Sequence, residues 1–206
     1  MHLATAQLAA TGSVASRRGN RYVSDDLAAV SFDTDLGWMA LAFRQEGVLT
    51  GVVFGHRSQQ KACESLRRYV AGNRSDTKFV DFLDEEQLPG PMADVVERLK
   101  SYAAGEAVDF SDVRIDDGHL TEFGRKIVKA CRRIARGGTK TYGELAARCG
   151  SPGAARAVGQ VMARNRYPLV VPCHRVLAAG GLIGGFSAPE GLTMKRRLLS
   201  LEQAIA

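Results

Sequence analysis

The sequence predicts an α+β protein, with a small β-sheet and helices followed by a mainly helical, winged-helix-like domain that contains a helix-turn-helix unit. Short apolar segments separated by turn residues begin the first part, which is typical of strands. Apolar residues at helical spacing dominate the second part. A polar, turn-rich stretch at 109–119 lies between them and indicates a boundary. We therefore expect an N-terminal arm at 1–28 and domains at 29–115 and 116–206.

Strands and helices of the first domain follow from local patterns. Apolar segments at 29–33, 38–43 and 48–54 are separated by turn residues, as in a β-meander. Residues 58–71 and 91–104 show the spacing of amphipathic helices, and a glycine follows each of them. No catalytic pattern is visible here, and we expect a surface loop at His56.

The second domain is expected to hold three helices in its first half. Residues 121–134 form the first, with apolar positions on its inner face. Thr141 can cap a short helix at Tyr142–Arg148, and a glycine-containing turn leads to another helix at 154–164. The last two form a helix-turn-helix unit. Many such pairs serve only for packing, so this geometry alone does not establish DNA binding.

The second helix of that pair has one apolar or small face and one polar surface. Its apolar or small face follows the i, i+3, i+4, i+7 pattern and consists of Ala155, Val158, Gly159 and Met162. Its polar positions lie elsewhere on the helix surface and are Arg156, Gln160 and Arg164. Small residues make the helix slim. A slim helix can approach a narrow groove, but it can equally pack tightly against another helix.

Composition narrows the protein class. The chain has 206 residues, 45% of them hydrophobic and 24% charged, which is ordinary for a globular protein. Its net charge of +6 suits an anionic partner, and no apolar run could cross a bilayer. The four cysteines (Cys63, Cys131, Cys149 and Cys173) are too scattered for a structural zinc site or a disulfide framework. We expect free thiols in a reducing, cytoplasmic setting.

Cys173 and His174 form the most informative pair in the chain. A thiol with a pKa near 8.5 is mostly protonated at pH 7, and a nearby base can convert it into a nucleophilic thiolate. Neighbours on an extended strand point to opposite faces, so cooperation requires a turn or a bridging water. An inert, buried cysteine remains the alternative reading of this pair.

The sequence around the pair resembles the O6-alkylguanine-DNA alkyltransferases, which are self-inactivating DNA-repair proteins. The resemblance covers roughly the last 40% of the chain and rests on several motifs in family order: 151–159 (SPGAARAVG), 165–176 (NRYPLVVPCHRV), 184–187 (GGFS) and 195–199 (KRRLL). The match in the N-terminal part is weak.

The resemblance implies roles for four catalytic residues. Cys173 would be the nucleophile and His174 its base, and the family's relay of cysteine, water, histidine and glutamate implies that Glu202 holds the imidazole. Asn165 would tie the helix-turn-helix unit to the active-site turn. Read without the resemblance, Glu202 is an exposed helix-end residue and Asn165 is a helix C-cap.

The resemblance also implies residues that contact DNA and the lesion. Tyr142 would help to rotate the target phosphate, Arg156 would replace the extruded base in the stack, and Ser187 and Val176 would contact the substrate. The segment 184–187 would cover the flipped base. Phe186 stands where many relatives have tyrosine, and 188–191 departs from the usual glycine pair.

The implied reaction is stoichiometric transfer of an alkyl group from O6-alkylguanine, and also from O4-alkylthymine, in double-stranded DNA to Cys173. The lesion is the alkyl donor, so we expect no cofactor and no metal, and we expect a monomer. The alternatives are a lesion-binding relative without repair activity, which would lack the cysteine, a helix-turn-helix regulator, and a Cys-His hydrolase. No oxyanion or triad pattern supports the hydrolase.

Overall fold

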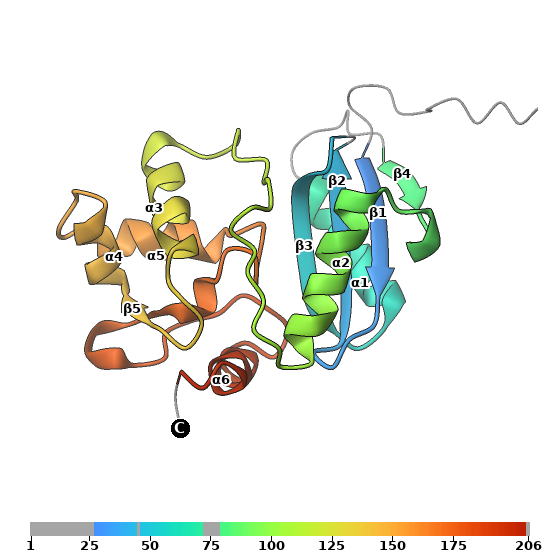
Figure 1. The fold of residues 1–206 in the computed structure, drawn as a ribbon. Helices are drawn as coiled ribbons and strands as arrows, with labels where there is room; N and C mark the ends of the chain where they lie inside the picture. The colour runs from blue at the N-terminus through green and yellow to red at the C-terminus, as the bar shows by residue number, and fades with distance from the viewer. Residues whose placement is uncertain (1–26, 45, 72–78, 205–206) are drawn as a thin grey trace, which may run out of the picture.

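The computed structural model describes residues 27–44, 46–71 and 79–204, arranged as a sheet-containing part beside a helical part (Figure 1). Residues 1–26 of the expected arm lie outside the described residues. The first strand begins at Leu27, within the range expected for that arm. The α+β class predicted from the sequence is confirmed.

The sheet has four strands in the order β3-β2-β1-β4. Strands β1 (Leu27–Phe32), β2 (Trp38–Arg44) and β3 (Val48–His56) form the predicted antiparallel meander. Strand β4 (Phe79–Phe82) pairs parallel with β1 and was not predicted. His56 ends β3 and is half-buried, so the prediction that it lies in a surface loop is wrong.

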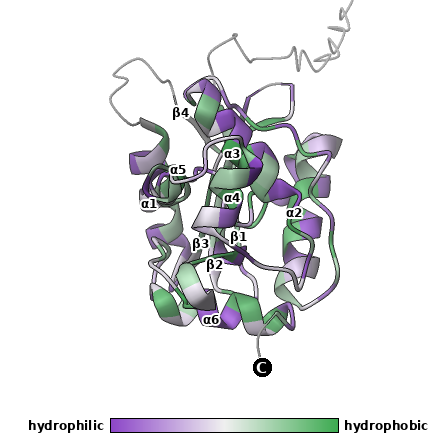
Figure 2. Cartoon of the chain, turned by 90° about the vertical axis from the view of Figure 1, so that its left-hand side faces the viewer, coloured by the Kyte–Doolittle hydropathy of each residue, from purple (hydrophilic) through white to green (hydrophobic). Residues whose placement is uncertain are grey.

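Two helices cover opposite faces of this sheet, and the 3-10 turn η1 (Glu85–Gln87) leads into the second of them. Helix α1 (Gln59–Ala71) packs on the face lined by small residues, including Ala29, Ala40 and Ala42. Helix α2 (Gly90–Ala103) packs on the other face, which carries the larger side chains that alternate with them. Both hydrophobic and hydrophilic residues occur along α2, as expected of a helix with one buried face (Figure 2).

The second part contains the helix-turn-helix unit, a two-stranded parallel pair and the last helix. Its elements are α3 (Glu122–Arg132), β5 (Lys140–Thr141), α4 (Tyr142–Arg148), α5 (Ala155–Ala163), η2 (Cys173–Arg175), β6 (Val176–Leu177), η3 (Ala179–Gly181) and α6 (Leu192–Leu201). The predicted cap of α4 is confirmed, because Thr141 Oγ1 accepts from the Glu144 amide at 3.1 Å and Glu144 Oε2 accepts from the Thr141 amide at 2.7 Å.

The two parts share one buried hydrophobic cluster, which contains residues of the sheet, α2, α3 and α6. Hydrogen bonds also join them. The Val52 amide donates to the Arg166 carbonyl at 2.9 Å, and the Tyr69 hydroxyl donates to the Asn165 carbonyl at 2.6 Å. Strand β3 and helix α1 are therefore fixed against the segment that leads to Cys173.

Candidate active site

Cys173 lies on a tight turn. The 3-10 turn η2 contains both Cys173 and His174, and the Cys173 amide donates to the Val171 carbonyl at 2.8 Å. The preceding Leu169 has a φ of +73°, a left-handed conformation that is uncommon for a residue with a side chain. From the sequence, the Cys and His side chains could cooperate through a turn or a bridging water. The structure has the turn, but no direct hydrogen bond joins the Cys173 thiol to His174 Nδ1.

Asn165 braces this turn from the end of α5. Its Nδ2 donates to the Val171 carbonyl at 2.8 Å, and its Oδ1 accepts from the Tyr167 amide at 3.0 Å. The C-cap of α5 is Arg164, so the prediction that Asn165 caps the helix is wrong by one residue. Asn165 has left the helix, which frees its side chain to span the loop.

Glu202 lies beneath the turn and holds His174. Its Oε1 is 2.8 Å from His174 Nε2, and both side chains are almost completely buried. The prediction from the local sequence that Glu202 is exposed is wrong, because Glu202 caps the packed end of α6. Arg175 donates to both carboxylate oxygens, each at 2.8 Å, and the Tyr102 hydroxyl donates to Oε1 at 2.6 Å.

This hydrogen-bond network fixes the protonation of His174. A carboxylate only accepts, so Nε2 carries the proton and Nδ1 keeps its lone pair. Nδ1 has no hydrogen-bond partner among the described residues. Burial lowers the pKa of His174 in spite of the Glu202 contact, so the imidazole is neutral near pH 7. Burial would raise the pKa of Glu202, but hydrogen bonds from His174 and Arg175 outweigh it and keep the carboxyl ionised.

Cys173 is buried and needs a base. Burial raises the pKa of its thiol, while a hydrogen bond from Asn165 and the charge of Lys195 oppose that rise. The thiol is therefore protonated near pH 7. Lys195 is completely buried, and its Nζ donates to the Val176 carbonyl at 2.7 Å.

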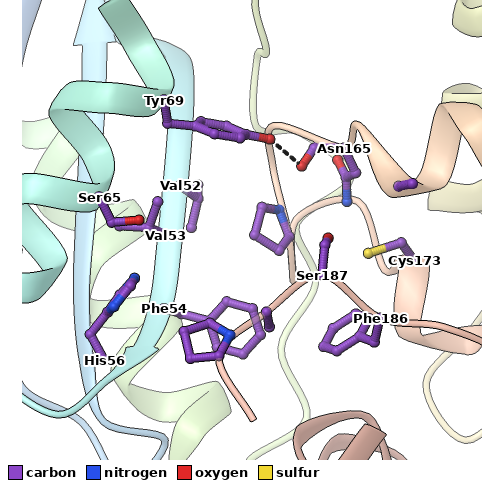
Figure 3. A pocket seen from close by; sticks show the side chains of 14 residues that line it. Val52, Val53, Phe54, His56, Ser65, Tyr69, Asn165, Cys173, Phe186 and Ser187 are labelled. Atoms are coloured by element: carbon purple, nitrogen blue, oxygen red, sulfur yellow. Dashed lines mark hydrogen bonds between the residues drawn. The ribbon is translucent and has the colours of Figure 1, made fainter. Parts of the chain in front are cut away.

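Two cavities touch Cys173. The helix-side cavity, of about 250 Å³, lies by α4, α5 and the segment after η3, and its lining includes Tyr142, Gly159, Met162, Phe186 and Ser187. The sheet-side cavity, of about 320 Å³, lies between Cys173 and the first part of the chain. Its lining includes Val53, His56, Ser65, Tyr69 and Pro168 (Figure 3).

The structure brings most of the expected DNA- and lesion-binding residues to one region. Tyr142 and Ser187 line the helix-side cavity, and Arg156 is exposed on α5. Phe186 lines both cavities. Val176 differs, because it is completely buried in β6 and its side chain lies in the core.

Sequence reasoning missed three residues of the site. Tyr102 lies within the helix predicted at 91–104 and had no assigned role, although its hydroxyl reaches Glu202 across 100 residues of sequence. Arg175 and Lys195 occur in the motifs of the resemblance but had no assigned role. For Arg175 the available signal was a basic residue within an otherwise apolar run, which requires a buried partner. Lys195 begins a run of three basic residues and Tyr102 lies on an amphipathic helix, so neither had such a signal.

Comparisons with known proteins identify the family. Residues 122–204 match the family model described as 6-O-methylguanine DNA methyltransferase, DNA binding domain. A methylated-DNA–protein-cysteine methyltransferase of Mycobacterium bovis is 42% identical over 118 residues, which cover 57% of this chain and 69% of the relative. The chain belongs to the methylated-DNA–protein-cysteine methyltransferase family. A Methanosarcina acetivorans member is 36% identical over 143 residues, covering 65% of this chain and 89% of that member.

Solved structures agree with membership in the methyltransferase family. The Mycobacterium tuberculosis OGT solved in complex with DNA has a TM-score of 0.65 and 32% identity, and covers 86% of this chain and 93% of its own. The O6-methylguanine-DNA methyltransferase of Pyrococcus kodakaraensis has a TM-score of 0.64 and 26% identity, and covers 85% and 98%. The expected family, fold, DNA-repair function and DNA partner are confirmed. Within the described ranges, no helix is long and apolar enough to cross a membrane.

Proposed function

We propose that Cys173 accepts the alkyl group of O6-alkylguanine in double-stranded DNA and keeps it as a thioether. The observation that carries this proposal is a buried thiol at the meeting point of two cavities, beside a neutral imidazole that Glu202 orients. The same chemistry extends to O4-alkylthymine. The protein acts as a monomer in the cytoplasm, where thiols stay reduced. Residues 116–206 carry the DNA-binding and transfer chemistry.

The proposed reaction balances without a cofactor. His174 Nδ1 takes the thiol proton through a bridging water, and the sulfur lone pair forms a bond to the alkyl carbon. The bond between that carbon and guanine O6 breaks, its electrons stay on the guanine, and the guanine takes a proton from solvent water while the thiol proton is held on His174. A thioether is a poor leaving group, so each molecule reacts once.

Access to the lesion requires that the nucleotide leave the duplex stack, at an expense of a few kcal/mol. Arg156 is exposed on α5 and can fill the gap, while Tyr142 at the helix-side cavity assists the rotation. Asn165 keeps the turn in place, and Ser187 and Val176 contribute to binding the extruded base, the latter through its backbone.

Intact mass after incubation with a duplex containing O6-methylguanine tests the proposal. The protein should gain one CH2 unit, and peptide mapping should place it on Cys173. Cys173→Ser should gain nothing, whereas Cys149→Ser is the matched control and should react normally. Binding without a mass gain, or a gain on another cysteine, would refute the assignment. Methyl transfer from a duplex that contains O4-methylthymine tests the second substrate. Sedimentation of the free protein tests whether it is a monomer.

A further inference from the structure

A third hollow, the rear groove, lies between α1, the start of α3 and α5, and Cys173 does not line it. It measures about 550 Å³. Helix α5 separates it from the helix-side cavity, because Gly159 and Met162 line that cavity whereas Gln160 and Arg164 line the rear groove. The two flanks of α5 therefore face two different spaces.

The rear groove carries positive charge that no described side chain neutralises. Arg164 and Arg166 line it, and within the described ranges neither guanidinium group makes a hydrogen bond or an ion pair. No acidic residue is among the residues that line it. Burial lowers the pKa of His119, and the charge of Arg166 adds to this effect, so that charge reaches the lining of the groove. The groove therefore suits an anionic ligand.

The rest of the lining suits a ligand that alternates charge with apolar surface. Leu120, Phe123 and Val161 contribute apolar side chains, and Gln160 adds an amide that can both donate and accept. A DNA backbone has this character, because each anionic phosphate is followed by a sugar. A small inorganic anion would leave the apolar part of the groove unused.

The polar residues of α5 connect the rear groove with the position proposed for the duplex. Arg156, Gln160 and the C-cap Arg164 are spaced by four residues, so they follow one face of the helix. Arg156 is the residue proposed to fill the gap in the stack. A helix that enters a groove of duplex DNA has one backbone on each flank. With the extruded base in the helix-side cavity, the other flank of α5 faces the opposite strand.

We infer that the rear groove binds the phosphate backbone of the strand opposite the lesion, and that Arg164 and Arg166 contact its phosphates. This inference rests on the proposed transfer from duplex DNA. Hydrogen bonds hold the frame of the groove in place. The Tyr69 hydroxyl donates to the Asn165 carbonyl at 2.6 Å (Figure 3), and the Val52 amide donates to the Arg166 carbonyl at 2.9 Å. A site held in this way loses little conformational freedom on binding.

Affinity for a duplex that contains O6-methylguanine tests the two arginines. The full chain carries Cys173→Ser, so that no methyl group moves during the measurement. At physiological salt, Arg164→Gln with Arg166→Gln should weaken binding at least about tenfold. The slope of log Kd against log salt should fall by about 1.8, since each phosphate contact contributes about 0.9. Lys129→Gln with Arg196→Gln removes the same charge from exposed positions outside the groove and should leave the affinity nearly unchanged.

Neutral linkages in one strand at a time identify the strand that is bound. Methylphosphonate linkages carry no charge. Placed throughout the opposite strand, they should weaken binding by the protein that keeps both arginines, and the double arginine variant should then lose nothing further. Placed in the lesion strand, they should leave the full effect of the double variant in place.

The outcomes separate this inference from the proposed function. An affinity and a salt slope equal to those of the control pair would overturn the inference. So would an effect of the double variant that disappears with the neutral lesion strand, or one that persists in full with the neutral opposite strand. Methyl transfer to protein that retains Cys173 is measured on the same unmodified duplex, and its absence would refute the proposed function. If the double variant is unfolded by its melting curve, Arg164→Gln alone, at an exposed position, gives the same comparison.

Discussion

Replacing Glu202 with glutamine tests the central network of the site. The side chain keeps its size but loses its charge, and one of its two acceptor oxygens becomes a donor. In the native protein those oxygens accept from Tyr102 at 2.6 Å, from His174 at 2.8 Å and twice from Arg175 at 2.8 Å. At least one of these donors will therefore face another donor. The Arg175 side chain, which is 10% exposed, loses its counter-charge.

The stability effect follows from the burial of this ion pair. Removing one partner of a buried pair costs about 3–5 kcal/mol, because the other charge remains uncompensated. For a chain of this length each kcal/mol moves the melting temperature by about 2–4 °C. We expect Glu202→Gln to melt roughly 6–20 °C lower. Transfer should slow about 100- to 10,000-fold, since His174 is no longer held as a base.

A double variant separates catalysis from stability. Arg175→Met combined with Glu202→Gln removes the uncompensated charge, so it should recover much of the melting temperature without recovering the rate. Single-turnover transfer from duplex DNA and thermal unfolding are measured for both variants. Glu144→Gln, an exposed capping residue, is the control and should transfer normally. Wild-type rates in folded Glu202→Gln would refute the reasoning, as would a rate that returns with stability in the double variant.

Three further substitutions test other parts of the site. Arg156→Ala should impair duplex repair far more than reaction with a free O6-alkylguanine, because only the duplex needs the gap filled; equal loss in parallel rate measurements would assign this residue to the fold. Burial places the pKa of His174 below the value near 6.5 of an unfolded histidine, so native stability falls as the pH drops below about 6.5. His174→Gln should flatten this dependence in denaturant titrations between pH 8 and 5, and an unchanged slope would show that other groups cause it. Asn165→Ala removes the bonds to Val171 and Tyr167 and should lower the free energy of unfolding by about 1–3 kcal/mol, with slower transfer; full stability in urea titrations would contradict this role.

Secondary-structure elements whose own residues carry a clear pattern could be predicted from the sequence. The meander follows from short apolar segments between turns, and the start of α4 follows from the capping pair Thr141 and Glu144. Strand β4 was not predictable in this way, because its four residues gain their partner only through parallel pairing with β1. That pairing is decided by the tertiary fold and leaves no local pattern.

The functional site likewise combines residues that the local sequence identifies with residues that only the tertiary fold brings in. Cys173 and His174 stand out in the sequence as neighbours with complementary chemistry, whereas Glu202 and Asn165 were assigned through the resemblance alone. Their local patterns predicted an exposed residue and a helix cap, and both were wrong. The burial of Glu202 depends on how α6 packs beneath η2, and Tyr102 reaches the site only because α2 packs there too.

The electrostatics of the network indicate where the thiol proton stops. Glu202 is held ionised by Arg175 and by the Tyr102 hydroxyl, and its pKa lies far below its usual range, so it cannot compete with imidazole for a proton. We therefore expect the proton from Cys173 to remain on His174, with Glu202 stabilising the imidazolium instead of receiving the proton. A base that is neutral at rest and stabilised once charged is sufficient here, because a protein that reacts once needs no group to reset the site.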